Sequence, residues 1–153
     1  MVAAPFITGK KRWIIVADES TAEIYQQEKR YSPVQQISVM HNDAAKKKVD
    51  DLITDHGGRS FDSFGAGRHT MSKEETGPKA EASRVFAKLV AARIITALNN
   101  GDIGQFGLIA APRFLGTLRK ALAGSHGAKP CLTVAKQLVG QEPAAIDRVL
   151  AEL

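Results

Sequence analysis

The segment at residues 54–71 is the part of the chain richest in side chains that could do chemistry. Its four glycines permit backbone shapes that other residues resist and allow a ligand to come close. Two arginines and two histidines beside them could contact phosphate groups. The candidate binding-loop residues are His56, Gly57, Gly58, Arg59, Ser60, Asp62, Ser63, Arg68 and His69. A mobile surface loop without a ligand is the simpler alternative.

The same segment contains the residue types of a hydrolase. Ser60 or Ser63 could act with a histidine and an aspartate, although closeness in sequence does not establish the hydrogen bonds that a triad needs. The histidine and aspartate spacing matches no metal motif, so no metal site is predicted. Gly65-Ala66-Gly67 lacks the third glycine of a dinucleotide fingerprint, and we expect no cofactor.

A second group of candidates is basic. The chain has a net charge of +5, and residues 101–140 contain five basic residues against one acidic residue. Arg113, Arg119 and Lys120 lie on one expected helix, outside its apolar stripe, and are candidate contacts to RNA. Solvated charges without a partner are the alternative.

The first third of the chain predicts three strands. Residues 13–17 are apolar and rich in β-branched types, and the turn-forming residues from Asp18 onward end this strand. Alternation over residues 22–26 predicts an antiparallel partner, and Val34, Ile37 and Val39 indicate a third strand. Trp13 is expected in the core. A long glycine-rich loop at about 42–80 follows, and loops of this length are usually functional or disordered.

The second half predicts an alternation of helices and strands. Residues 81–98 form the clearest helix, with Val85, Phe86, Leu89 and Val90 expected on one side. Strand, helix and strand are predicted at residues 106–111, 113–122 and 131–135, and a last helix begins at Pro143. The right-handed crossover rule makes the two strands parallel.

Length and composition restrict the class of protein. A chain of 153 residues with ordinary globular composition predicts one domain over residues 1–153. The longest apolar runs are far below the roughly 20 residues that a membrane span requires, so no membrane insertion is expected. A single cysteine, Cys131, allows no internal disulfide. With no export signal visible at the amino terminus, a cytoplasmic location is expected.

Three segments together carry a resemblance to a known family. Residues 13–18 (Trp-Ile-Ile-Val-Ala-Asp), 55–63 (Asp-His-Gly-Gly-Arg-Ser-Phe-Asp-Ser) and 110–119 (Ala-Ala-Pro-Arg-Phe-Leu-Gly-Thr-Leu-Arg) resemble the bacterial host-attachment protein family. That family is similar to the central domain of archaeal and eukaryotic peptide release factors and of Pelota-type rescue factors. The resemblance implies an α/β, ribonuclease-H-like domain with a mixed sheet, an antiparallel opening hairpin, parallel later strands and flanking helices.

The release-factor similarity also implies a function. Gly57-Gly58-Arg59 falls where those factors carry a Gly-Gly-Gln loop, and Arg59 replaces the glutamine. This implies a release-factor-like module that binds RNA or the ribosome without efficient peptide release, and it favours a protein that is not an enzyme. Two alternatives stay open: a hydrolase that uses the 55–69 loop, and a protein-interaction factor involved in host attachment.

Overall fold

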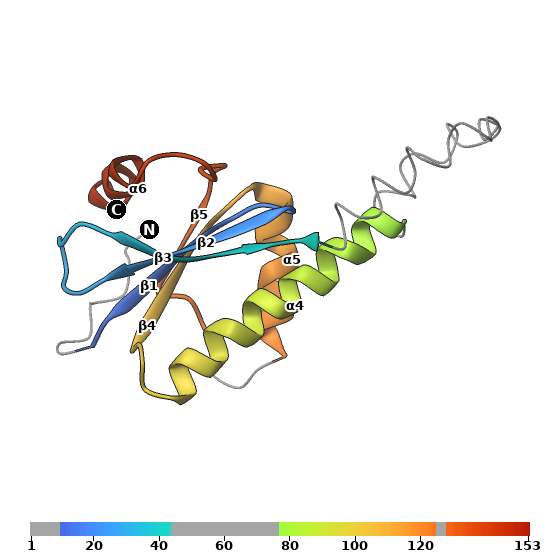
Figure 1. Ribbon diagram of the computed structural model, residues 1–153, viewed down its shortest axis with the longest axis horizontal. Coiled ribbons are helices and arrows are strands. Elements are labelled where there is room, and N and C mark those ends of the chain that lie inside the picture. Colours follow the sequence, from blue (N-terminus) through green and yellow to red (C-terminus); the bar gives the residue numbers. More distant parts are fainter. Residues whose placement is uncertain (1–9, 44–76, 125–127) are drawn as a thin grey trace.

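The computed structural model describes residues 10–43, 77–124 and 128–153. These residues form five strands and three helices (Figure 1). In chain order they are β1 (Arg12–Ala17), β2 (Thr21–Gln27), β3 (Gln35–His41), α4 (Pro78–Asn99), β4 (Gln105–Ala110), α5 (Pro112–Ala123), β5 (Leu132–Ala135) and α6 (Pro143–Ala151). Most of the predicted glycine-rich loop, residues 44–76, lies outside the described residues.

The strands form one mixed sheet in the order β3-β2-β1-β4-β5. β2 pairs antiparallel with both β1 and β3. β4 pairs parallel with both β1 and β5. The predicted antiparallel opening hairpin and the parallel later strands are therefore confirmed, and the arrangement is consistent with the ribonuclease-H-like fold that the resemblance implies.

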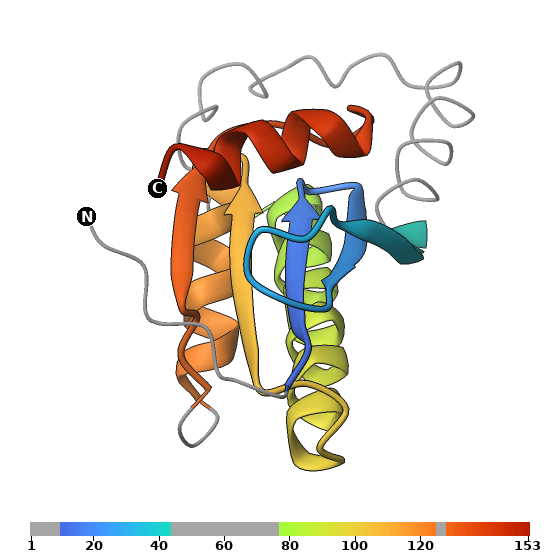
Figure 2. The same ribbon diagram turned by 90° about the vertical axis from the view of Figure 1, so that its left-hand side faces the viewer.

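Helices cover both faces of the sheet. α4 and α5 lie side by side on one face, and α6 lies on the other (Figure 2). Because successive side chains of a strand point to opposite faces, β1 contributes to two cores. Trp13 and Ile15 pack with Phe86 of α4 and Phe114 of α5, whereas Ile14 packs on the α6 side. β1 is therefore buried between α4 and α5 on one face of the sheet and α6 on the other.

The inward face of α4 differs from the prediction. Phe86 and Val90 are buried as expected, but Val85 and Leu89 are 42% and 56% exposed. The prediction counted only large apolar residues. The buried face instead runs through several alanines of α4, whose small side chains allow the helix to approach the sheet closely.

β3 is less buried than its apolar residues suggested. Ile37 and Val39 are exposed, and Met40 packs against the core beneath α4. The pairing of β3 with β2 is irregular beside Ile24 and Tyr25, and the strand lies at the end of the sheet order. As an outer strand of the sheet, β3 therefore keeps the apolar side chains of Ile37 and Val39 partly exposed.

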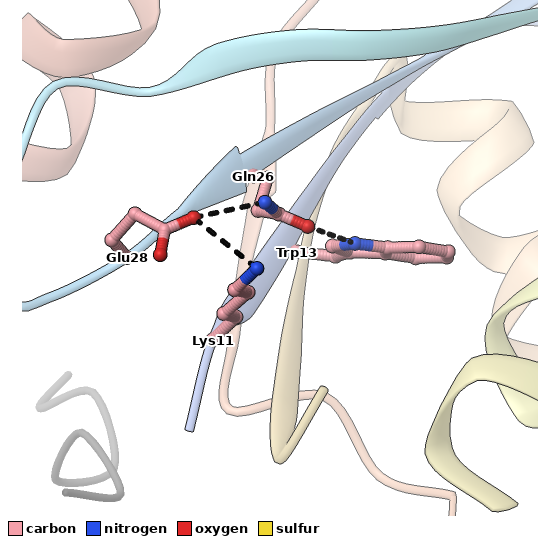
Figure 3. Close-up of polar contacts among 4 residues, drawn as sticks. All are labelled: Lys11, Trp13, Gln26 and Glu28. Carbon is pink, nitrogen blue, oxygen red and sulfur yellow. Dashed lines mark hydrogen bonds and ion pairs between the residues drawn. The ribbon is translucent and has the colours of Figure 1, made fainter. Parts of the chain in front are cut away.

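A chain of polar contacts joins the ends of β1 and β2 (Figure 3). The indole Nε1 of Trp13 donates to Gln26 Oε1 at 3.4 Å, and Gln26 Nε2 donates to Glu28 Oε2 at 2.9 Å. Lys11 Nζ lies 3.7 Å from the same Glu28 oxygen. On the helix side, the guanidinium of Arg93 lies 5.4 Å from the centre of the Trp13 ring. Trp13 is buried among these contacts, which confirms its expected place in the core.

Candidate functional site

The order of elements brings two helix amino termini to one edge of the sheet. α4 precedes β4 and α5 follows it, so each helix runs opposite to the strand that it adjoins. The first turns of both helices consequently lie near the carboxyl end of β4 (Figure 2). In sheets of this kind, ligands bind beyond the carboxyl ends of parallel strands.

A groove with a volume of about 1140 Å³ opens between α4 and α5 at this edge. We call it the α4–α5 groove. Its described lining residues are Glu19, Gly77, Pro78, Lys79, Ala80, Ser83, Arg84, Lys88, Arg113, Gly116, Thr117, Lys120 and Ala121. Five of these side chains are cationic and one is a carboxylate, so the groove is strongly basic.

The cations follow the periodicity of the two helices. Arg84 and Lys88 of α4 are four residues apart and share a helix face, and Arg113 and Lys120 share a face of α5. All four side chains are exposed. Arg84 Nη2 also lies 2.8 Å from Glu81 Oε1, but both side chains are about half exposed, and such surface pairs contribute little stability. The arrangement concentrates positive charge on the exposed faces of two neighbouring helices.

The helix ends add to the positive potential. Proline occupies the first turn of both helices, and the N-cap residues are Gly77 in α4 and Ala111 in α5. Neither N-cap residue has a side chain that can accept a hydrogen bond from the first turn. Backbone N–H groups and the helix dipole therefore favour an anion at this edge.

The three predicted RNA contacts on α5 do not all line the groove. Arg113 and Lys120 line the groove, but Arg119 does not. Its Nη2 instead donates to Thr133 Oγ1 of β5 at 2.8 Å. With 3.6 residues per turn, Arg119 lies about 100° around the helix from Lys120, and this rotation turns it from the groove toward β5.

Sequence reasoning missed the contribution of α4. Lys79, Arg84 and Lys88 line the groove, yet none of the basic candidates predicted from the sequence lies on α4. The spacing of Arg84 and Lys88 opposite a buried face was a usable signal. Their nearness to Arg113 and Lys120 depends on the packing of two helices that are separated in sequence.

The candidate residues of the glycine-rich segment are not described by the structure. His56, Gly57, Gly58, Arg59, Ser60, Asp62, Ser63, Arg68 and His69 all lie outside the described residues. Within residues 10–43, 77–124 and 128–153, no three His, Cys, Asp or Glu side chains are grouped so that they could hold a metal ion.

A cluster of polar contacts ties β1 and β2 to the segment before α6. Asp18 Oδ1 accepts hydrogen bonds from the backbone N–H groups of Ser20 and Thr21, each at 2.8 Å. Asp18 Oδ2 accepts one from Gln137 Nε2 at 2.9 Å. Burial opposes the ionisation of Asp18, but the hydrogen bonds from Ser20, Gln137 and Thr21 outweigh it and lower the pKa of the carboxyl group. Asp18 is therefore a turn residue, as the sequence suggested.

Glu23 is a buried carboxylate in the same region. It accepts hydrogen bonds from the Tyr25 hydroxyl at 3.3 Å and from the backbone N–H of Gly140 at 3.1 Å. Burial and the neighbouring Glu23 carboxylate raise the pKa of Tyr25 to about 12. These groups satisfy one another and fix the chain before α6 to the sheet.

A smaller pocket of about 400 Å³ lies between the ends of β1, β2 and α6. We call it the Arg12 pocket. Arg12 is only 7% exposed, and its Nε donates to Gln27 Oε1 at 3.0 Å. Its Nη1 lies 3.8 Å from Cys131 Sγ, and burial of Cys131 raises the pKa of that thiol despite the nearby guanidinium. A raised pKa makes a thiol less reactive, because the thiolate is the nucleophile.

A comparison with known protein families shows which family the chain belongs to. A family model described as "Protein required for attachment to host cells" matches residues 13–150. The chain belongs to this family. The match extends from β1 into α6 and includes every described residue that lines the α4–α5 groove. No curated protein matches the chain. None of the helices within the described ranges is long and apolar enough to cross a membrane.

Proposed function

We propose that this host-attachment-family protein is a cytoplasmic RNA-binding module, and that its α4–α5 groove binds the phosphate backbone of structured RNA such as that of the translation machinery. The observation that carries the proposal is the grouping of five cationic side chains from two helices around one groove. Phosphate contacts supply most of the affinity of proteins for nucleic acid, and clustered lysines and arginines are their usual source.

The composition of the groove favours phosphate over base recognition. Among its described lining residues none is aromatic, whereas proteins that hold unpaired bases usually stack them on aromatic rings. The amino termini of α4 and α5 also lie at this edge, and helix amino termini favour anions. These features support binding to an RNA surface that presents phosphates rather than splayed bases.

The proposal excludes efficient peptide release. In the release-factor resemblance, Arg59 occupies the position of the glutamine that helps organise the hydrolytic water. A guanidinium is permanently charged and better suited to phosphate than to positioning a neutral water. Hydrolysis of peptidyl-tRNA on stalled ribosomes, measured with the native protein and with Arg59→Ala, would reveal an enzyme if release is efficient and depends on Arg59.

A role in RNA binding is compatible with a family whose members are described as required for attachment to host cells. A protein that is required for attachment need not itself touch the host, because binding to RNA can change the synthesis of proteins that do. On this proposal the effect on attachment is indirect, and it depends on the basic groove.

The proposal is tested by removing charge inside and outside the groove. The test variant is Arg113→Ala with Lys120→Ala, and the matched control is Arg119→Ala with Lys129→Ala, two exposed cations that do not line the groove. Binding to ribosomes is followed by co-sedimentation, and binding to a labelled structured RNA by fluorescence anisotropy over a salt series.

We expect the test variant to reduce the slope of log affinity against log salt by about two, because each lost phosphate contact removes about one. The control should change it much less. Absence of RNA binding by the native protein at low salt would refute the proposal, and equal losses in the two variants would show that the groove is not the site.

A further inference from the structure

Gly116 stands at a costly position in α5. It lies in the interior of the helix, with Pro112 four residues before it and Ala123 seven residues after it. Glycine in a helix interior destabilises the folded state relative to alanine, because the unfolded chain gains conformational freedom. A glycine at such a position calls for a physical reason.

The packing of the described residues supplies no such reason. Among residues 10–43, 77–124 and 128–153, no heavy atom lies within 4 Å of a Cβ atom added at Gly116, and Gly116 does not have a positive φ. Gly107 of β4 shows the contrasting case, since a Cβ there would lie 2.7 Å from Leu132 Cγ. Alanine would therefore fit at Gly116 without strain, whereas Gly107 is required by its neighbours.

The open space beside Gly116 belongs to the α4–α5 groove. Gly116 and Thr117 line the groove between Arg113 and Lys120, one turn to either side along α5. The Thr117 hydroxyl donates to the Arg113 carbonyl oxygen at 3.3 Å, so its proton is already used within the helix. The two cations supply the donors for an anion, and Gly116 leaves bare backbone between them.

We propose that Gly116 is the point at which the backbone of double-stranded RNA comes closest to the protein, with one phosphate group lying against α5 between Arg113 and Lys120. The inference rests on the proposed RNA binding and adds the class of RNA. A duplex presents phosphates on its outside and keeps its bases stacked, which suits a groove whose described lining lacks aromatic side chains. A side chain at position 116 would occupy the place of the phosphate.

The test uses the full chain with substitutions of increasing size. Gly116→Ala and Gly116→Gln are compared with Gly124→Ala and Gly124→Gln. Gly124 is a suitable control because no heavy atom of the described part of the chain lies within 4 Å of a Cβ added there either. It also has helical backbone angles and is not among the lining residues of the groove. Affinity for a short RNA duplex and for one of its separated strands is measured over a salt series, together with the thermal unfolding temperature.

We expect Gly116→Ala to raise the unfolding temperature while weakening duplex binding roughly threefold to tenfold and lowering the salt slope by about one. Gly116→Gln should weaken binding further, and both Gly124 variants should bind as the native protein does. The native protein should bind the duplex more tightly than the single strand.

The outcomes separate this inference from the proposed function. If the native protein binds RNA and the Arg113 and Lys120 variant loses affinity, while both Gly116 variants bind as tightly as their Gly124 controls, the close approach at Gly116 is wrong and the RNA-binding groove stands. Equal affinity for duplex and single strand would overturn the assignment to double-stranded RNA. Loss of RNA binding in the native protein itself would remove the proposed function along with the inference.

Discussion

The α4–α5 groove and the Arg12 pocket lie on opposite faces of the same sheet, and arginine lines both. In the groove, Arg84 and Arg113 are exposed on helix surfaces. In the pocket, Arg12 is buried on β1 and bound to Gln27 of β2. Both sites contain arginine, but the guanidinium is buried in the pocket and exposed in the groove.

This difference separates a structural charge from one that can serve a ligand. The contacts of Arg12 connect β1 to β2 and to the residue before β5, so its guanidinium holds parts of the fold together. A buried charge must be compensated within the protein, because it has lost its contact with water. An exposed cation keeps its hydration and can exchange it for contact with a phosphate. The two sites share the residue type, so burial of the guanidinium is what distinguishes them.

The largest expected effect is on the Arg12 pocket. Arg12→Met should lower the free energy of unfolding by about 2–3 kcal/mol, because it removes charged hydrogen bonds and leaves Gln27 without that partner. Urea unfolding measures this. Arg30→Met is the control, since Arg30 lines the same pocket but is exposed and should change stability by less than about 0.5 kcal/mol. Similar losses in the two variants would contradict the distinction by burial.

An intermediate effect is expected at Tyr25, on the same face as the Arg12 pocket. Tyr25→Phe removes one buried hydrogen bond to Glu23 and should lower the free energy of unfolding by about 1 kcal/mol at neutral pH. Because folding raises the pKa of Tyr25 from 10.0 to about 12, its neutral form is favoured in the folded state. That contribution is complete below pH 10 and is lost as the pH rises toward 12.

The pH dependence offers a sharper test than the loss at neutral pH. Between pH 10 and 12, the native protein should lose stability more steeply than Tyr25→Phe does. Tyr31→Phe is the matched control, because Tyr31 is the other tyrosine and is 83% exposed. A parallel decline in the native protein and in Tyr25→Phe would show that this hydroxyl does not account for the alkaline loss.

The smallest expected effect is on the stability of the groove variant. Arg113→Ala with Lys120→Ala should change the free energy of unfolding by no more than about 0.5 kcal/mol, because both side chains are exposed. Thermal and urea unfolding measure it alongside the RNA-binding assay. A loss as large as that of Arg12→Met would assign the groove cations to the fold and remove the contrast between the two arginine sites.

The sequence predicted the positions of the strands and helices better than it predicted which of their side chains are buried. Hydrophobic runs and turn residues located all five strands and three helices of the described residues to within a few positions. The pattern of large apolar residues was wrong for Val85 and Leu89, because alanines formed much of the buried face of α4. The proposed contacts at Arg113 and Lys120 fall on one groove, whereas Arg119 falls elsewhere. The roles of the glycine-rich candidates at 56–69 stay predictions.

Local spacing along the chain determined the strands, the crossover and the family, because these depend on neighbouring residues and short motifs. The sequence alone did not place Arg84 and Lys88 beside Arg113 and Lys120, since no local pattern relates α4 to α5 across β4. Only the packing of both helices on one face of the sheet created the groove and left Gly116 open within it. It likewise decided that Arg12 is buried while the groove arginines are exposed, because burial depends on what the whole fold places around a side chain.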